Sequence, residues 1–203
     1  MLLESDMRLL IALVLVLLVG CDSGSTPTEQ AQPAAAVQAE TNPRADVGLE
    51  SASGMRATLS YRFAGGPAPK ATFTGADGRD VTLADFAGRP LLVNIWATWC
   101  APCKAEMPTL DALAALEEGR VSVIAVSQDL EGRTPVKAFF DKSAIVNLEP
   151  YTDRDNALLS AFSNNIALPT TVLYDSEGVE VWRVMGGVEW DDAEMAKLLK
   201  EAG

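Results

Sequence analysis

The chain has 203 residues and a formal net charge of −12 at neutral pH. A chain this acidic, without a cluster of lysines and arginines, is poorly suited to binding nucleic acid. It contains no histidine and only three cysteines, too few for a structural zinc site or a disulfide-rich scaffold. We therefore expect neither a metal ion nor another cofactor.

The first element is an uncharged apolar run, residues 9–19, that follows Arg8. A helix needs about 20 apolar residues to cross a bilayer, so this run is too short for a membrane span and is typical of an export signal. Met7 is an alternative start, because the acidic residues before it fit the charged end of such a signal poorly. We expect residues 1–20 to be a signal peptide.

The signal ends in Leu18-Val19-Gly20-Cys21, which resembles the bacterial lipobox, a motif that is cleaved before its cysteine and lipidated there. Several acyl chains on one residue anchor a protein firmly, since each buried methylene contributes about 0.8 kcal/mol. Asp22 resembles the signal that retains Gram-negative lipoproteins in the inner membrane. We expect a lipid on Cys21 and a location on the bacterial inner (cytoplasmic) membrane, facing the periplasm. The alternative is a chance cysteine near an ordinary cleavage site.

Residues 21–68 are rich in Ala, Pro, Thr, Ser, Gln and Glu and show no clear hydrophobic periodicity. Segments of this composition bury too little apolar surface to fold, so we expect a disordered tether after the lipidated cysteine. Within it, residues 58–63 alternate between apolar and polar and suggest a short strand. The remaining residues, 69–203, have the size of a normal single domain.

The domain alternates between short apolar runs and helical patterns. We predict strands at residues 71–74, 81–83, 91–96, 121–126, 170–174 and 179–184, a helical turn at 83–86, and helices at 103–118, 135–144, 156–164 and 191–202. This order favours an α/β fold in which helices flank a central mixed sheet, with an N-terminal hairpin. A dithiol motif between the first buried strand and its helix is the pattern of a thioredoxin-like fold.

The dithiol motif is Trp99-Cys100-Ala101-Pro102-Cys103. The thiolate is the form of cysteine that attacks a disulfide, and a free cysteine has a pKa of about 8.5. Cys100 lies just before the predicted helix, where unpaired N–H groups and the helix dipole favour a negative sulfur. We predict a redox disulfide in which Cys100 is the nucleophile and Cys103 resolves the mixed disulfide. A structural disulfide is the alternative, but so small a loop stabilises little.

The sequence around the dithiol, W-A-T-W-C-A-P-C-K-A-E-M-P at residues 96–108, resembles the TlpA/ResA branch of the thioredoxin superfamily. Members of this branch are tethered, extracytoplasmic thiol–disulfide oxidoreductases. The resemblance covers residues 69–203 and implies that residues 147–164 form the family's added helix–strand element. It also implies disulfide-containing exported proteins as substrates, for example apocytochrome c, and a membrane electron donor of the CcdA/DsbD type. We expect a monomer.

The resemblance further implies that Pro169 is a cis-proline that faces the dithiol and that the backbone of Leu168 pairs with a substrate segment. The residues alone leave open an ordinary proline at the entry to a strand. We expect the substrate-binding surface to consist of Trp99, Ala101, Pro102, Leu168 and Pro169.

Glu106 follows Cys103 by one helical turn, and the family has a carboxylate beneath the dithiol at the matching position. Burial would raise the pKa of this carboxyl and let it exchange protons with Cys103. Asn94 stands where thioredoxin has a buried aspartate, which makes Glu106 the better candidate for the proton acceptor. The alternative is a glutamate that faces solvent.

Three other functions use features of the same sequence. An oxidant that forms disulfides would use the same residues in reverse, because direction depends on the reduction potential. A peroxidase of the peroxiredoxin type is disfavoured by the close spacing of Cys100 and Cys103. A copper-binding assembly factor is disfavoured by the absence of histidine.

Overall fold

The computed structural model describes residues 44–162 and 166–203. The predicted signal peptide, the predicted lipidation site Cys21 and about half of the predicted tether lie outside these residues. No helix within the described part is both long enough and apolar enough to cross a membrane.

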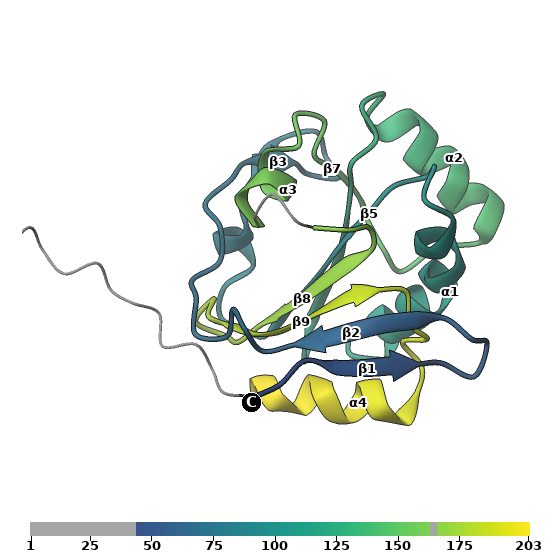
Figure 1. The fold of residues 1–203 in the computed structure, drawn as a ribbon. Helices are drawn as coiled ribbons and strands as arrows, with labels where there is room; N and C mark the ends of the chain where they lie inside the picture. Colours follow the sequence, from purple (N-terminus) through teal and green to yellow (C-terminus); the bar gives the residue numbers. More distant parts are fainter. Residues whose placement is uncertain (1–43, 163–165) are drawn as a thin grey trace, which may run out of the picture. The chain divides into compact units, whose positions relative to one another are not determined.

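The described strands form one mixed sheet in the order β1-β2-β9-β8-β5-β6-β7-β3-β4 (Figure 1). The strands are β1 (Val47–Glu50), β2 (Arg56–Ser60), β3 (Phe73–Thr74), β4 (Asp80–Val81), β5 (Leu91–Trp96), β6 (Ser122–Ser127), β7 (Pro150–Thr152), β8 (Thr170–Tyr174) and β9 (Glu180–Gly186). β5, β6 and β7 run parallel, and β8 and β9 pair antiparallel beside them. β5 lies in the middle of the sheet, and all of its residues are buried, as its continuous apolar sequence predicts.

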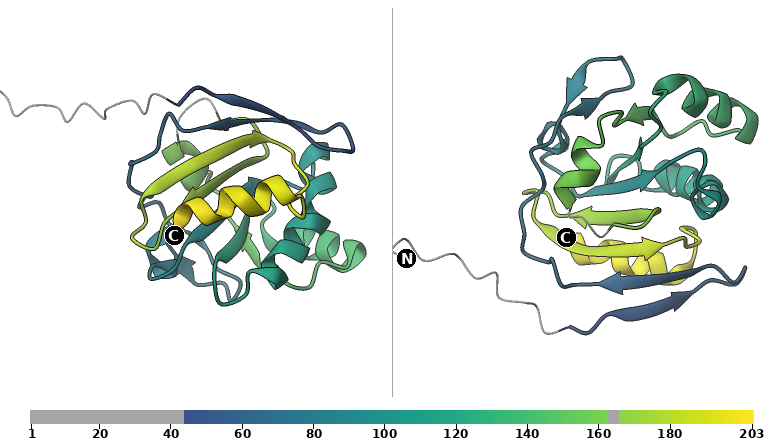
Figure 2. Two further views of the ribbon diagram at one scale, coloured as in Figure 1. Left: turned by 90° about the horizontal axis from the view of Figure 1, so that it is seen from below. Right: turned by 45° about the horizontal axis from the view of Figure 1, so that its top comes forward.

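The helices cover both faces of this sheet. They are η1 (Leu83–Phe86), α1 (Ala101–Leu116), α2 (Arg133–Ser143), α3 (Ala157–Phe162), α4 (Ala193–Leu199) and η2 (Lys200–Ala202). Apolar residues of α1, α2 and α4 pack in one cluster with Leu92 and Trp96 of β5. Residues of α3 and η1 pack in a second cluster with Val93 and Ile95. Alternate residues of β5 therefore face opposite layers. Figure 2 shows α4 lying along β9. The expected α/β fold class is confirmed.

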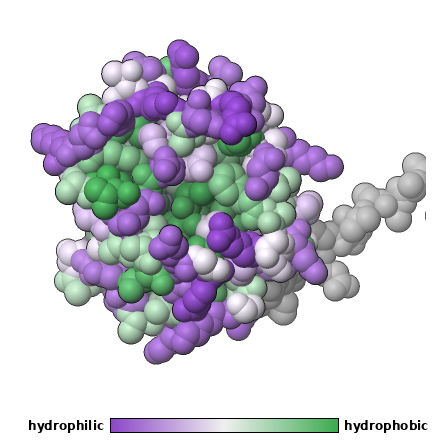
Figure 3. Space-filling model, turned by 180° about the vertical axis from the view of Figure 1, so that it is seen from behind, coloured by the Kyte–Doolittle hydropathy of each residue, from purple (hydrophilic) through white to green (hydrophobic). Residues whose placement is uncertain are grey.

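On the face shown in Figure 3, hydrophilic side chains surround a smaller hydrophobic area. Among the described residues, the large apolar side chains that remain exposed include Trp99, at 67%.

The predicted tether is wrong at its C-terminal end. β1 and β2 form an antiparallel ribbon, and β2 adds to the sheet by pairing with β9 from Ala57↔Gly186 to Ser60↔Arg183. Leu49, Ala57 and Leu59 of this ribbon are buried. The folded part thus begins before residue 69. The short strand predicted at residues 58–63 overlaps β2. The rest of the ribbon looks like a linker in sequence because the partner strand that stabilises it lies more than a hundred residues further along the chain.

Two smaller predictions also need correction. α1 begins at Ala101 rather than at residue 103, since Cys100 serves as its N-cap. In the described part of residues 147–164, predicted as a helix–strand element, β7 precedes α3, and the helix before β7 is α2. The predicted N-terminal hairpin is confirmed as β3 and β4, joined through a turn at Gly78, whose φ of 86° suits glycine.

Candidate active site

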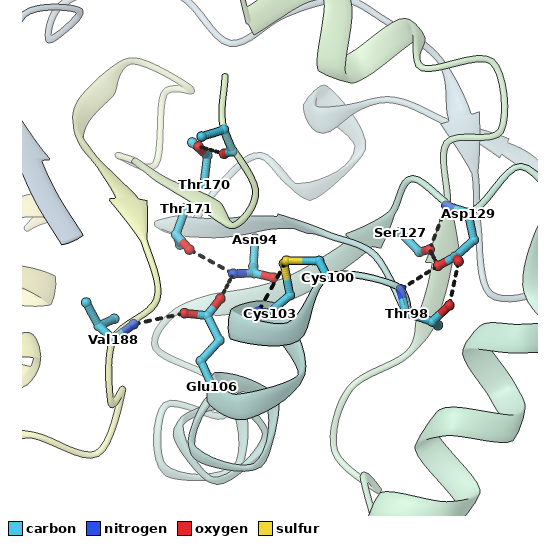
Figure 4. The surroundings of a disulfide bond; sticks show 11 residues. Asn94, Thr98, Cys100, Cys103, Glu106, Ser127, Asp129, Thr170, Thr171 and Val188 are labelled. Carbon is cyan, nitrogen blue, oxygen red and sulfur yellow. Dashed lines mark hydrogen bonds between the residues drawn. A yellow bond between two sulfur atoms is a disulfide. The ribbon is translucent and has the colours of Figure 1, made fainter. Parts of the chain in front are cut away.

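Cys100 and Cys103 form a disulfide at the N-terminal end of α1 (Figure 4). The Sγ atom of Cys100 accepts the backbone N–H of Cys103 at 3.3 Å. Pro102 lies in the first turn, where a missing N–H costs no helical hydrogen bond. This N–H at the start of α1 is thus directed at the sulfur of Cys100, an arrangement that favours its thiolate. Cys103 is fully buried and Cys100 is 6% exposed, so Cys100 is the sulfur nearer to solvent.

The residues expected around the dithiol come from around the start of α1 and from the segment before β8. Ala101 and Pro102 are exposed beside Trp99. The Leu168–Pro169 peptide is cis, as predicted. Leu168 packs against the cluster that contains both cysteines.

Glu106 lies inside the protein, one turn after Cys103 on the same face of α1, and none of its surface is exposed. Its Oε1 accepts a hydrogen bond from Asn94 Nδ2 at 2.7 Å, and its Oε2 accepts one from the N–H of Val188 at 3.1 Å. Burial raises the pKa of this carboxyl to about 8, and the hydrogen bonds only partly oppose the shift. The expected burial and the raised pKa are confirmed, while the catalytic role stays a prediction.

Asn94 links β5, α1 and β8 beneath the dithiol. Besides its hydrogen bond to Glu106, its Nδ2 donates to the hydroxyl of Thr171 at 2.8 Å. Side chains alternate between the two faces of β5, so Asn94 faces the same layer as Leu92 and Trp96, the layer that contains α1. Figure 4 shows its amide between Glu106, Thr171 and the disulfide.

A second buried carboxylate, not predicted from the sequence, holds the segment before Cys100. Asp129 accepts the backbone N–H of Thr98 at 2.9 Å and its hydroxyl at 2.6 Å, and it also accepts the hydroxyl of Ser127 at 2.6 Å. Ser127 is the last residue of β6, and Asp129 lies two residues after it. Polar residues at the carboxyl end of a parallel strand that neighbours the active-site strand are the signal that could have identified this pair.

The loop after β9 closes the other side of the site. A Cβ atom at Gly187 would lie 3.5 Å from Pro102, an ordinary van der Waals distance, so this loop lies against the first turn of α1. The next residue, Val188, supplies the N–H that binds Glu106. Within residues 44–162 and 166–203, no group of three or more potential side-chain ligands is arranged to hold a metal ion.

The family model described as Redoxin matches residues 63–199 of this chain. The chain belongs to the Redoxin family. The thiol-disulfide oxidoreductase ResA of Bacillus cereus is 30% identical to this Redoxin protein over 141 residues, which cover 69% of this chain and 80% of the relative.

Solved structures of thioredoxin-like proteins have a similar fold. A putative thiol-disulfide oxidoreductase from Bacteroides vulgatus has a TM-score of 0.59 and 26% identity, and the match covers 71% of this chain and 99% of that one. The exposed lipoprotein thioredoxin of Streptococcus pneumoniae has a TM-score of 0.53 and 26% identity over 64% of this chain and 97% of that one. This Redoxin protein is a ResA-like thiol–disulfide oxidoreductase of the thioredoxin superfamily, as predicted.

Proposed function

We propose that this protein reduces disulfide bonds in exported proteins outside the cytosol, with apocytochrome c as an example of such a substrate. The observation that carries the proposal is the Cys100–Cys103 pair at the N-terminal end of α1 with the buried carboxyl of Glu106 one turn below it. A nucleophile near solvent, a buried resolving thiol and an internal proton acceptor are the groups that dithiol exchange needs.

In the proposed reaction, the Cys100 thiolate attacks one sulfur of the substrate disulfide, and the other substrate sulfur leaves and takes up a proton. Cys103 then loses its proton and attacks Cys100 Sγ. This step forms the Cys100–Cys103 disulfide and releases the second substrate thiol. Two electrons pass from the protein dithiol to the substrate.

Glu106 is proposed as the group that takes the proton of Cys103. A general base works best when its pKa lies near the working pH, and the pKa of Glu106 of about 8 satisfies that requirement. Its position one helical turn from Cys103 supports direct exchange or exchange through one water molecule.

The rim around the dithiol is proposed to bind the substrate. Trp99, Ala101 and Pro102 supply an exposed surface next to Cys100. On the opposite side, the backbone at Leu168, before the cis-proline Pro169, is proposed to pair with an extended segment of the substrate.

We further propose that residues 1–20 are a signal peptide, that Cys21 carries a lipid, and that the domain lies as a monomer on the periplasmic side of the inner membrane. The likeness to an exposed lipoprotein thioredoxin supports an anchor of this kind. A reductant in an oxidising compartment must itself be reduced again after each reaction, so we include a membrane electron donor of the CcdA/DsbD type in the proposal.

The roles of the two cysteines can be tested by trapping. With Cys103→Ser, Cys100 should stay covalently attached to its substrates, which reducing agent then releases for identification. Cys100→Ser is the matched control and should trap nothing. Trapping by Cys100→Ser alone would reverse the assignment.

The direction can be tested by equilibrating the protein with glutathione. A reduction potential well below about −200 mV supports a reductant, whereas a value near that of strong oxidants, about −120 mV, contradicts it.

A further inference from the structure

Asn94 is completely buried, and its hydrogen bonding is incomplete. Its Nδ2 uses both hydrogens, one for Glu106 and one for Thr171. Its Oδ1 has no hydrogen-bond partner among the residues that the structure describes. A buried acceptor without a donor costs free energy, and most such groups in proteins have a functional or structural reason.

The position of Asn94 indicates which donor is missing. Nδ2 is occupied by Glu106 and Thr171, on the side of the amide away from the dithiol in Figure 4. In Figure 4 the oxygen of this amide lies on the side of the disulfide, whose Cys103 is one turn before Glu106 on α1. Cys103 is fully buried, so solvent cannot supply a partner for its sulfur.

We propose that Asn94 Oδ1 is the hydrogen-bond acceptor for the thiol of Cys103 in the reduced protein. An external thiolate attacks Cys100 Sγ, the Cys100–Cys103 bond breaks, and Cys103 leaves as a thiolate that takes up a proton. A second donor thiol then releases Cys100, and the donor becomes a disulfide. The new S–H group of Cys103 points at Asn94, whose oxygen gains the partner that it lacks while the disulfide is intact.

Two consequences follow from this acceptor. The hydrogen bond exists only in the reduced state, so it stabilises that state and raises the reduction potential. It also holds Cys103 as a neutral thiol, which leaves Cys100 as the thiolate and separates the roles of the two sulfurs. The inference rests on the dithiol exchange of the proposed function, but not on its substrate or its direction.

The test compares Asn94→Leu with Thr171→Val in the full chain. Both variants remove a buried hydrogen bond of Nδ2, but only Asn94→Leu removes the acceptor next to Cys103. In equilibrium with dithiothreitol, Asn94→Leu should shift the constant about tenfold towards the disulfide, equivalent to about 30 mV. Thr171→Val should stay within about twofold of the wild type. Equal shifts in the two variants, or none in Asn94→Leu, would overturn the inference.

A double-mutant cycle separates Asn94 from Glu106, because Asn94→Leu also removes a donor to that carboxyl. In the Glu106→Gln background, Asn94→Leu should still shift the equilibrium about tenfold. A shift that disappears in this background would mean that Asn94 acts through Glu106 alone, which contradicts the proposal.

The hydrogen bond itself can be observed in the infrared S–H stretch of Cys100→Ser. In the difference spectrum against Cys100→Ser/Asn94→Leu, the Cys103 band should move from a hydrogen-bonded to a free frequency. Asn94→Asp keeps an acceptor at this position and should keep the band hydrogen-bonded, so the inference stays testable if the leucine variant fails to fold. An unmoved band in Asn94→Leu contradicts the inference. A wild-type protein that cycles normally but leaves substrates oxidised would refute the proposed function and not this inference.

Discussion

The carboxylate of Asp129 accepts both the backbone N–H and the hydroxyl of Thr98, at 2.9 and 2.6 Å. Thr98 lies two residues before Cys100, and Asp129 lies just beyond the end of β6. This double hydrogen bond fixes the segment that carries Trp99 and the nucleophilic cysteine to the central sheet. The position of Cys100 therefore depends on a residue outside the dithiol motif.

Replacing this carboxylate should weaken the fold next to the dithiol. Asp129→Ala leaves the Thr98 N–H and the Ser127 hydroxyl without their acceptor, so we expect a loss of about 1–3 kcal/mol in the free energy of unfolding, measured in urea. Asp141→Ala is the matched control, since Asp141 forms an exposed pair with Lys137 and should change stability by less than about 0.5 kcal/mol. Equal losses in both variants would contradict the assigned role.

The rate at which Cys103 resolves the mixed disulfide should depend on the ionisation of Glu106. The pKa of Glu106 is raised to about 8, and only the deprotonated carboxylate can accept a proton. The rate should therefore rise with pH and level off above about 8, as measured by stopped-flow release of a thiol from a preformed mixed disulfide. Glu106→Gln should lower the plateau and remove the inflection. An inflection near pH 8 that survives in Glu106→Gln would have to come from another group.

Removing one partner of the buried ion pair between Glu180 and Arg183 should destabilise the protein more than removing both. Arg183 Nη2 lies 2.7 Å from Glu180 Oε2, and both side chains are 5% exposed. Burial raises the pKa of Glu180, and Arg183 opposes the shift. Arg183→Met should cost about 3–5 kcal/mol of stability at neutral pH, because it leaves a buried charge unpaired.

The double variant Arg183→Met/Glu180→Leu should recover much of that stability, since no buried charge remains. Thermal unfolding of the wild type, the two single variants and the double variant gives the coupling energy. Additive losses would show that the two residues act independently.

Gly186 should not tolerate a side chain. Its φ is 107°, and a Cβ atom would collide with the carbonyl oxygen of Arg56 in β2. Gly186→Ala should therefore cost more than about 1 kcal/mol and increase hydrogen exchange in β2. Gly78→Ala is a suitable control, because its φ of 86° is similar but a Cβ atom there meets nothing within 4 Å. A smaller loss in Gly78→Ala isolates the contact with β2.

The sequence predicted the parts of the molecule whose signals are local. The apolar run of β5, the dithiol before α1 and the turn at Gly78 each need only neighbouring residues for their interpretation. Glu106 could be placed beneath the dithiol because one helical turn fixes its position relative to Cys103. These features account for most of the central sheet and for the centre of the site.

The features that were missed depend on partners far apart in the chain. The place of β2 in the sheet comes from its pairing with β9, and the role of Asp129 comes from Thr98, about thirty residues earlier. The incomplete hydrogen bonding of Asn94 is likewise visible only when β5, α1 and β8 are together. No pattern within a short window of sequence contains this information.

The β1–β2 ribbon also bears on how this domain should be expressed. A chain cut at residue 69, the boundary that composition suggests, would lack the strand that pairs with residues 183–186 of β9. The bare N–H and C=O groups of β9 would then be free to pair with another molecule. We expect such a fragment to self-associate, whereas a fragment that begins before Val47 keeps β9 paired with β2.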